Sequence, residues 1–276
     1  SPDPDNSSES HLFGLEPNYG CCTANMGQGW PKLALRTIQQ TKHGLLCAHL
    51  LPCRVKTEIQ GKPVSVRIDS EYPFKLRADI AVEAENVCFE LKIRIPGWAK
   101  KVLLNGAEVQ AEHGHITITK HWNGAETLRL VLEDVPRFAD RPQGMKAAEY
   151  GPLVFSLPIQ AKYHRREYTK DGVERKAPYC DWELEPQSEW RYGLASPDLT
   201  VEELPIDARP FSSQHPSIVL KASLAPVNWE WADGYDTVPA VMPASRKPIG
   251  KPQSMPLIPY GCAKLRMTEL PGIEED

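Results

Sequence analysis

Residues 88–95 read CFELKIRI, a run in which apolar and charged side chains alternate. Successive side chains of a β-strand point to opposite faces of a sheet, so this run would place its large apolar groups on one face. Those groups are Phe89, Leu91, Ile93 and Ile95. The charged groups between them would face water, as in an antiparallel sheet with one buried face. The stretch therefore predicts a half-buried β-strand.

The same alternation recurs on both sides of this stretch. The further runs are VSVRI (64–68), LRADIAV (76–82), HITIT (115–119) and TLRLVLE (127–133). Turn dipeptides separate the runs at short intervals, namely Pro96-Gly97, Asn105-Gly106, His113-Gly114 and Asn123-Gly124. Short strands with frequent turns favour a β-sandwich or jelly roll over a parallel sheet. We predict a first β-sandwich over residues 42–141.

Strand-like runs continue toward the C-terminus, but long stretches separate them. The runs are EYGPLVFSLPI (149–159), DWELE (181–185), SIVLKASLAPVNWEW (217–231) and AKLRMTEL (263–270). The stretches between them, such as 161–178 and 239–256, are rich in proline and charge and predict large loops. We predict a second β-sandwich over residues 142–276.

Residues upstream of the strands have a helical spacing instead. The apolar residues that recur on one helix face are Trp30, Leu33, Ala34 and Ile38. Pro31 suits the first turn of a helix and Gly44 suits a stop. A start capped by Asn25 is the alternative, but it would leave Pro31 inside the helix. We predict a turn followed by a helix from Trp30 to about Thr41.

Length and charge limit what the chain can do. At about 100 to 150 residues per domain, 276 residues fit two domains better than one. The net charge is −4 and both signs are interspersed, so the basic stripe of a nucleic-acid-binding protein is absent. No apolar run approaches the ~20 residues that span a bilayer, and we expect no membrane partner. The opening SPDPDNSSES lacks a starting Met and a signal-peptide pattern, and we expect a cut there.

Two adjacent cysteines, Cys21 and Cys22, precede the predicted helix. Neighbouring Cα atoms lie about 3.8 Å apart, less than a normal disulfide needs, so both are expected to be free thiols or thiolates. Two thiols on one turn can both reach a zinc ion, but they supply only half of its ligands. From the residues alone, two buried structural cysteines remain the favoured interpretation. The seven cysteines cannot all pair, and most lie singly in apolar, strand-like surroundings, which favours a reducing and thus cytoplasmic location.

Other polar and aromatic residues give weaker signals. The histidines lie in turns or at strand ends, and Glu16 is the one acid near the cysteine pair; all are expected to be solvated or packed. Trp229 and Trp231 would share one face of a strand, with Trp182 and Trp190 near a sheet edge. Aromatic faces stack on sugars, but a buried core is the commoner place for tryptophan.

Five motifs in order make the sequence resemble the C-terminal part of glycoside hydrolase family 127, whose characterised members are β-L-arabinofuranosidases. The motifs are GLEPNYGCCTANMGQGWPKLA (14–34), LKIRIPGWA (91–99), EYGPLVFSLPI (149–159), WELEPQSEWRYGL (182–194) and LIPYGCAKLRMTELP (257–271). The resemblance implies a mainly β chain. Residues 1–41 would end an (α/α)6 barrel, and two jelly-roll-like β-sandwiches would follow at 42–141 and 142–276.

The resemblance also implies a zinc site. By motif position Cys21 would be the nucleophile and a zinc ligand, and Cys22 a second ligand. The acid/base glutamate and the other two ligands would lie upstream of residue 1, because neither Glu16 nor a later cysteine matches them. The chain by itself is therefore expected to be inactive. Its expected partners are an arabinose-containing glycan or glycoside, the upstream barrel segment and, as an option, a second copy in a homodimer.

Two alternatives involve no chemistry. The chain could be a β-sandwich module that binds carbohydrate or a partner through Trp229, Trp231 or the loop at 161–178. It could also be a structural module that braces a barrel, in which case the apolar side of the helix at 30–41 would be exposed.

Overall fold

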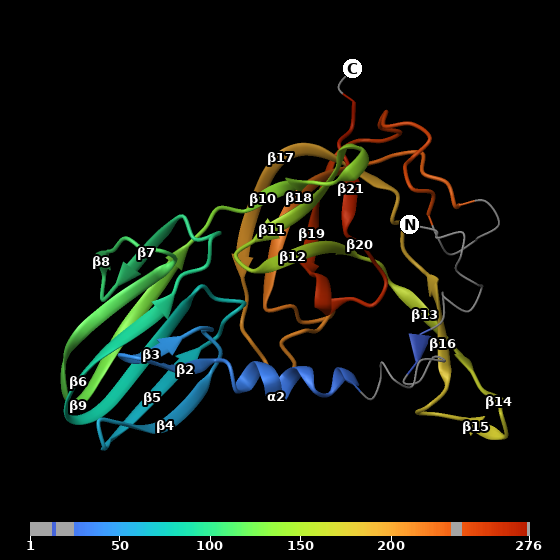
Figure 1. Cartoon of the computed structure of the whole chain (residues 1–276). Helices are drawn as coiled ribbons and strands as arrows, with labels where there is room; N and C mark the ends of the chain where they lie inside the picture. Colours follow the sequence, from blue (N-terminus) through green and yellow to red (C-terminus); the bar gives the residue numbers. More distant parts are fainter. Residues whose placement is uncertain (1–12, 15–24, 233–238, 275–276) are drawn as a thin grey trace. The chain divides into compact units, whose positions relative to one another are not determined.

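The computed structural model describes residues 13–14, 25–232 and 239–274. The chain forms two compact units, each treated by itself below (Figure 1). We call Gly27–Val135 the middle unit, and Pro136–Asp276 together with Ser1–Met26 the outer unit. Strands dominate both units, which confirms the mainly β prediction. The barrel remnant, the jelly-roll form and the domain limits at 41 and 141 stay predictions.

The middle unit is one eight-stranded sheet. Its strands are β2 (Ile38–Thr41), β3 (Gly44–Cys47), β4 (Cys53–Ile59), β5 (Lys62–Ser70), β6 (Arg77–Arg94), β7 (Lys101–Leu104), β8 (Ala107–Glu108) and β9 (His115–Glu133). They run in the order β2-β3-β6-β9-β7-β8, with β5 added to β6 and β4 to β5. The predicted strand at 88–95 forms the second half of β6.

A β-bulge in β6 keeps one face of this sheet apolar. Before the bulge the buried residues have even numbers, from Ala78 to Ala84; after it they have odd numbers, from Val87 to Ile93. The register with β9 shifts between Ala84 and Val87, where two residues oppose one. This extra residue returns the side chains of the second half to the buried face. Asn86, at φ 53°, forms the bulge, and its carbonyl accepts a 2.6 Å hydrogen bond from Lys62 Nζ.

The two halves of β6 have different neighbours. The first half pairs with β5, antiparallel, and the second pairs with β3, parallel. At the start of β3 the chain passes so close to β6 that a Cβ on Gly44 would lie 2.0 Å from the carbonyl oxygen of Glu90. The amide of Glu90 donates to the carbonyl of His43 at 3.0 Å. Only glycine permits this approach, so Gly44 begins the parallel pair rather than stopping a helix.

The helix predicted from Trp30 to Thr41 is wrong in its second half. Helix α2 covers only Gly29–Ala34, and none of its residues is buried. The Thr37 side chain caps its end by donating to the carbonyl of Leu33 at 3.1 Å. Ile38 then enters strand β2 opposite Cys47 and becomes buried. Strand pairing with β3 therefore overrides the local helical spacing, and the predicted apolar stripe, with Trp30 75 % exposed, is not a packed face.

The outer unit contains a second eight-stranded sheet. Its strands are β10 (Arg137–Asp140), β11 (Met145–Tyr150), β12 (Leu153–Pro158), β17 (Tyr192–Glu203), β18 (Ile218–Pro226), β19 (Gln253–Pro259), β20 (Arg266–Met267) and β21 (Glu269–Pro271). The order is β10-β11-β12-β19-β18-β17, with β20 on β12 and β21 on β11. Short 3-10 turns lie at Pro142–Gly144 and Tyr260–Cys262. Its core includes a cluster of Met145, Ile159, Trp190, Val227 and Trp229.

The stretch 161–178, predicted as a large loop, is mostly strand. It contains β13 (Ala161–Arg166), which pairs with β16 (Asp181–Pro186), and the hairpin β14 (Tyr168–Lys170)–β15 (Val173–Arg175). β16 also pairs with the short β1 (Phe13–Gly14). Few of these side chains are buried, so the strands lack apolar alternation. The turn at Asp171-Gly172, with both φ values positive, was the signal that could have revealed the hairpin.

Trp122 should anchor the middle unit. It is 1 % exposed, stacks on Phe89 with ring centroids 5.4 Å apart, and donates its indole N–H to the Phe89 carbonyl at 3.1 Å. Trp122→Ala is expected to lower the free energy of unfolding by about 3–5 kcal/mol, measured by urea denaturation. The matched control Trp30→Ala, at an exposed site, should change it by no more than about 0.5 kcal/mol. Equal losses from both variants would contradict this packing.

Candidate functional site

The cysteine pair predicted to bind zinc, Cys21 and Cys22, lies outside the described residues, as does Glu16. Their roles stay predictions. Among residues 13–14, 25–232 and 239–274, no group of three or more His, Cys, Asp and Glu side chains is placed to hold a metal ion. By themselves, the described residues therefore contain no set of side chains that could form a zinc site.

Three of the cysteines that the structure describes, Cys47, Cys53 and Cys262, lie in surroundings unsuited to nucleophilic catalysis. Burial, together with the nearby Cys53 thiol, raises the pKa of Cys47 to about 12. Burial also raises the pKa of Cys53, and that of Cys262 to about 11. A thiol attacks or binds a metal as its thiolate, and these three remain protonated at neutral pH. Cys47, Cys180 and Cys262 are buried in the core, whereas Cys53 is half-buried and Cys88 is exposed.

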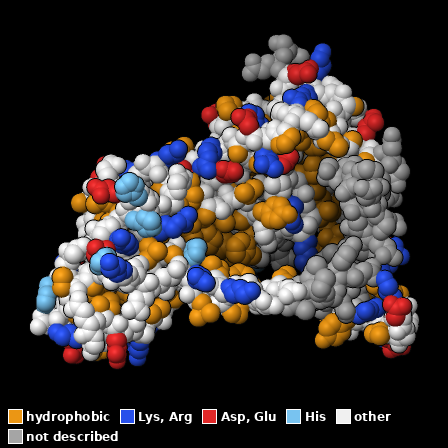
Figure 2. All heavy atoms as spheres, viewed as in Figure 1, with side chains coloured by type: hydrophobic (Ala, Val, Ile, Leu, Met, Phe, Trp, Pro, Cys, Tyr) orange, Lys and Arg blue, Asp and Glu red, His pale blue; other side chains and the backbone are white. Residues whose placement is uncertain are grey.

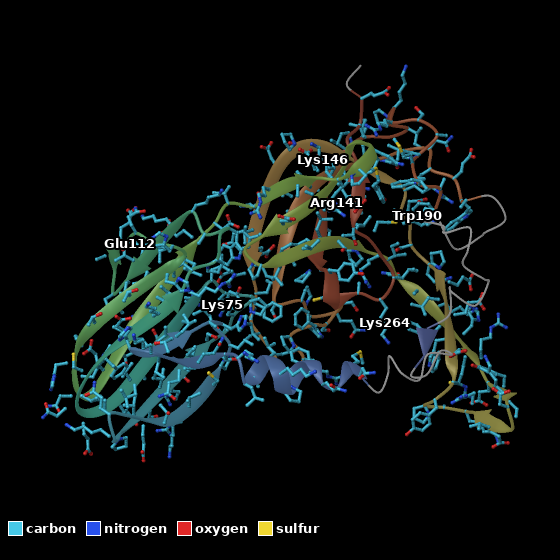
Figure 3. All side chains as sticks on the ribbon, in the orientation of Figure 1. Lys75, Glu112, Arg141, Lys146, Trp190 and Lys264 are labelled. Atoms are coloured by element: carbon cyan, nitrogen blue, oxygen red, sulfur yellow. The ribbon has the colours of Figure 1, made fainter. Side chains whose placement is uncertain are left out.

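Three of the four tryptophans considered above come together, and Trp190 and Trp229 lie in the core, the place that the sequence analysis favoured for them. Trp190 packs against Trp229 and Trp231, with ring centroids 5.7 and 4.7 Å apart. Trp229 is 2 % exposed and donates its indole N–H to the carbonyl of Ala240 at 2.7 Å. β18 ends at Pro226, so Trp229 and Trp231 do not lie on a shared strand face. Figure 3 labels Trp190, the centre of this cluster.

A charged pair covers the tryptophan cluster. The Arg191 guanidinium lies over the rings of Trp190 and Trp231, 5.0 and 5.8 Å from their centroids. Glu189 accepts hydrogen bonds from the backbone amides of Trp190 and Arg191 at 2.9 and 3.0 Å. Burial tends to raise the pKa of Glu189, but these hydrogen bonds and the Arg191 charge outweigh it, so that the pKa is lowered. This arrangement stabilises the cluster and leaves little of it open to a ligand.

The outer unit has a cavity that the sequence analysis missed. It has a volume of about 490 Å³, and its polar lining residues include Arg141, Gln143, Thr268 and Glu269. Arg141 and Glu269 are 128 positions apart in sequence, and Arg141 Nε donates to Glu269 Oε1 at 2.8 Å. No local spacing connects residues so far apart, so no sequence motif could have indicated this cavity.

Charged side chains of both signs are mixed over the face of the described residues that Figure 2 shows. Many are paired along the sheets, as in Arg129 with Asp79 at 3.2 Å and Arg137 with Glu149 at 2.7 Å. Among the described residues, no helix is both long and apolar enough to cross a bilayer.

Cys47 should make stability depend on alkaline pH. Folding raises the pKa of the Cys47 thiol from 9.0 to about 12. The contribution of this buried, protonated thiol to the free energy of unfolding is therefore complete below pH 9.0 and is lost as the pH rises toward 12. The difference in unfolding free energy between the wild-type protein and Cys47→Ala should therefore shrink over this range. The control Leu45→Ala, a buried site on the same strand without a titrating group, should show a constant difference. A constant difference for Cys47→Ala would contradict this assignment.

Comparisons with known proteins find one family whose model matches part of the chain. Residues 44–133 match the model of the middle domain of GH127 β-L-arabinofuranosidases. No curated protein matches the chain. A solved GH127 β-L-arabinofuranosidase from Geobacillus stearothermophilus T6 is similar in structure, with a TM-score of 0.57 and 19% identity over 94% of this chain and 37% of that one.

Two further solved structures are also similar in fold to this chain. A protein titled glycoside hydrolase matches with a TM-score of 0.56 and 16% identity, over 94% of this chain and 41% of that one. A GH127 β-arabinofuranosidase matches with a TM-score of 0.54 and 15% identity, over 92% and 38%. The chain thus spans about two fifths of the length of these structures. Residues 44–133 thus match the model of the GH127 middle domain, and the chain as a whole shares its fold with these solved structures.

Proposed function

We propose that the chain is the C-terminal part of a zinc-dependent, retaining glycoside hydrolase that acts on β-L-arabinofuranosides. The match of residues 44–133 to the middle domain of these enzymes is the observation that carries the proposal. The cysteine pair at the position of the family's motif, and the fold shared with two solved arabinofuranosidases, support it further. An arabinose-containing glycan or glycoside as substrate, and a homodimer, belong to the same proposal.

Cys21 and Cys22 would hold the zinc ion in this proposal. Two adjacent thiols are a donor set that suits zinc, which binds thiolate sulfur in a tetrahedral shell. Bound zinc would lower the pKa of a coordinating thiol and keep it as the thiolate. The buried thiol of Cys47, with its pKa near 12, illustrates how strongly a packed environment without such a charge opposes ionisation. The remaining ligands would come from outside the described residues.

Cys21 would act as the nucleophile in two steps. Its sulfur attacks the anomeric carbon, a C–S bond forms, and the bond to the leaving-group oxygen breaks as a general acid protonates that oxygen. The conjugate base then takes a proton from water, which attacks the same carbon and releases the Cys21 thiolate. Two inversions give net retention of configuration. The acid/base group is expected upstream of residue 1, so we expect no hydrolysis by the chain alone.

The alternative of a non-catalytic sugar-binding module has less support. It depended on Trp229 and Trp231, whose rings pack on Trp190 and beneath Arg191 rather than facing solvent. The segment 161–178 does present exposed apolar groups, among them Tyr163 and Val173. Tyr163, however, packs edge-on against Trp182 with centroids 6.2 Å apart. The family match therefore supports the hydrolase proposal more than the binding-module alternative.

A comparison of this chain with a version extended upstream through the barrel tests the proposal. Zinc content is measured by elemental analysis, and turnover with a chromogenic β-L-arabinofuranoside. We expect zinc and turnover only in the extended protein. There, Cys21→Ala should reduce turnover by about 10³-fold or more, because the covalent step is lost. Cys22→Ala should lower zinc occupancy, whereas the control Cys88→Ala, at an exposed site in β6, should change neither. Full activity of Cys21→Ala would overturn the assignment.

A further inference from the structure

The cavity lined by Arg141 and Glu269 in the outer unit has the dimensions of a ligand site. Its volume of about 490 Å³ falls within the range of about 300–1,000 Å³ that is typical of small-molecule pockets. We call it the Arg141–Glu269 cavity. Three segments far apart in sequence form it, namely the turn after β10, the chain that follows Pro239, and the β20–β21 region. Figure 3 labels Arg141 on the first of these.

One wall of the cavity is held by the tryptophan cluster. The indole N–H of Trp229 donates to the carbonyl of Ala240 at 2.7 Å, and the Ala240 amide donates to the carbonyl of Glu230 at 2.9 Å. Trp231 forms an isolated β-bridge with Pro239. The indole hydrogen bond and this bridge, of which the Ala240–Glu230 bond is part, thus attach residues 239–240 to the core. Hydrogen bonds to the core hold this wall, which lowers the cost of ordering it when a ligand binds.

The opposite wall is a turn in an unusual conformation. Gln143 has φ 61° and Gly144 has φ 70°, both in the left-handed region. Arg246 Nη2 donates to the carbonyl of Gln143 at 2.6 Å, and a Cβ on Gly144 would lie 3.2 Å from the Arg246 guanidinium. The Arg141 amide closes the turn by donating to the carbonyl of Met145 at 2.8 Å. A non-glycine residue in this region costs energy and persists only where its surroundings hold it, as Arg246 does here.

The polar side of the cavity offers paired donors and acceptors without net charge. Arg141 Nε donates to Glu269 Oε1, and both side chains are about half exposed. Within the described residues this bond uses one of the five N–H donors of Arg141 and one of the two oxygens of Glu269. The free donors and the second oxygen are charge-assisted partners for hydroxyl groups. Among the residues that line the cavity the charges of Arg141 and Glu269 offset each other, which favours a neutral ligand over an anion or a cation.

The other side of the cavity is apolar. Met145, Met267, Val241 and the edge of Trp229 line it. Met145 and Trp229 are buried, whereas Val241 is exposed at the rim. A ligand that fits has one apolar face and one edge carrying neighbouring hydroxyls. One hydroxyl would accept from Arg141 while the next donates to Glu269. We propose that the Arg141–Glu269 cavity binds a single neutral sugar residue, held by two adjacent hydroxyl groups against an apolar wall.

Saturation-transfer NMR and calorimetric titration of the whole chain test this proposal. The probes are L-arabinose, D-galactose and D-glucose, with D-glucuronate as the charged comparison. We expect at least one neutral sugar to bind and glucuronate to bind less tightly. Glu269→Gln should weaken binding about tenfold or more, because a charge-assisted hydrogen bond is lost. Val241→Trp should abolish binding by filling the cavity. The matched control Glu149→Gln breaks a similar ion pair with Arg137 at 2.7 Å, outside the cavity, and should leave binding unchanged.

Several results would overturn the proposal. The first is that the folded wild-type chain binds none of the neutral sugars. The second is that Glu269→Gln and Val241→Trp both still bind them. The third is that the wild-type chain binds D-glucuronate more tightly than the neutral sugars. Circular dichroism checks that each variant is folded. If Glu269→Gln does not fold, Val241→Trp decides the test, because Val241 is exposed and its replacement disturbs the fold less. The proposal is independent of the hydrolase proposal, so binding should persist when both Cys21 and Cys22 are replaced by alanine.

Discussion

The bulge at Asn86 is the constraint on which the middle unit depends. β6 and β9 pair over almost their whole length, so their apolar side chains must stay on one face of the sheet from end to end. In the sequence of β6 the apolar positions change from even to odd numbers, which in a regular strand would move them to the other face. The extra residue at the bulge returns them to the buried face. Lys62 holds the Asn86 carbonyl and the ring of His121 hydrogen-bonds the Asn86 side chain, so polar contacts fix the point of reversal. The apolar face that results lies within residues 44–133, the stretch that matches the GH127 middle-domain model.

Cysteine chemistry in this chain depends on environment rather than on residue type. Cys47 is fully enclosed, and its thiol has a pKa far above neutrality because no nearby charge compensates for the lost water. Cys262 shows the same effect to a smaller degree. A cysteine that attacks a sugar needs the opposite surroundings, with a positive charge close to the sulfur. The buried thiols therefore indicate what the proposed zinc ion would have to supply at the cysteine pair.

Buried aromatic residues can serve a site without touching solvent. Trp229 lies in the core of the outer unit, yet its indole N–H holds the carbonyl of Ala240 and thereby one wall of a cavity. Arg246 does the same for the facing turn at Gln143. Both walls are anchored by hydrogen bonds to backbone carbonyls, which are strong and directional. Rigid walls of this kind let a half-exposed ion pair such as Arg141–Glu269 present hydroxyl-binding groups in a fixed geometry.

The sequence by itself determined the features that depend on near neighbours. Alternation at 88–95 and in the flanking runs predicted strands correctly, because the side-chain period of a strand is a local property. Ordered motifs predicted the family resemblance, and the family match over 44–133 agrees with it. Tertiary structure decided the rest. Ile38 became strand because β3 lies beside it, 161–178 formed a polar hairpin and strand, and Trp229 turned inward. Arg141 met Glu269 only through folding, since pairing and burial depend on residues far away in the chain.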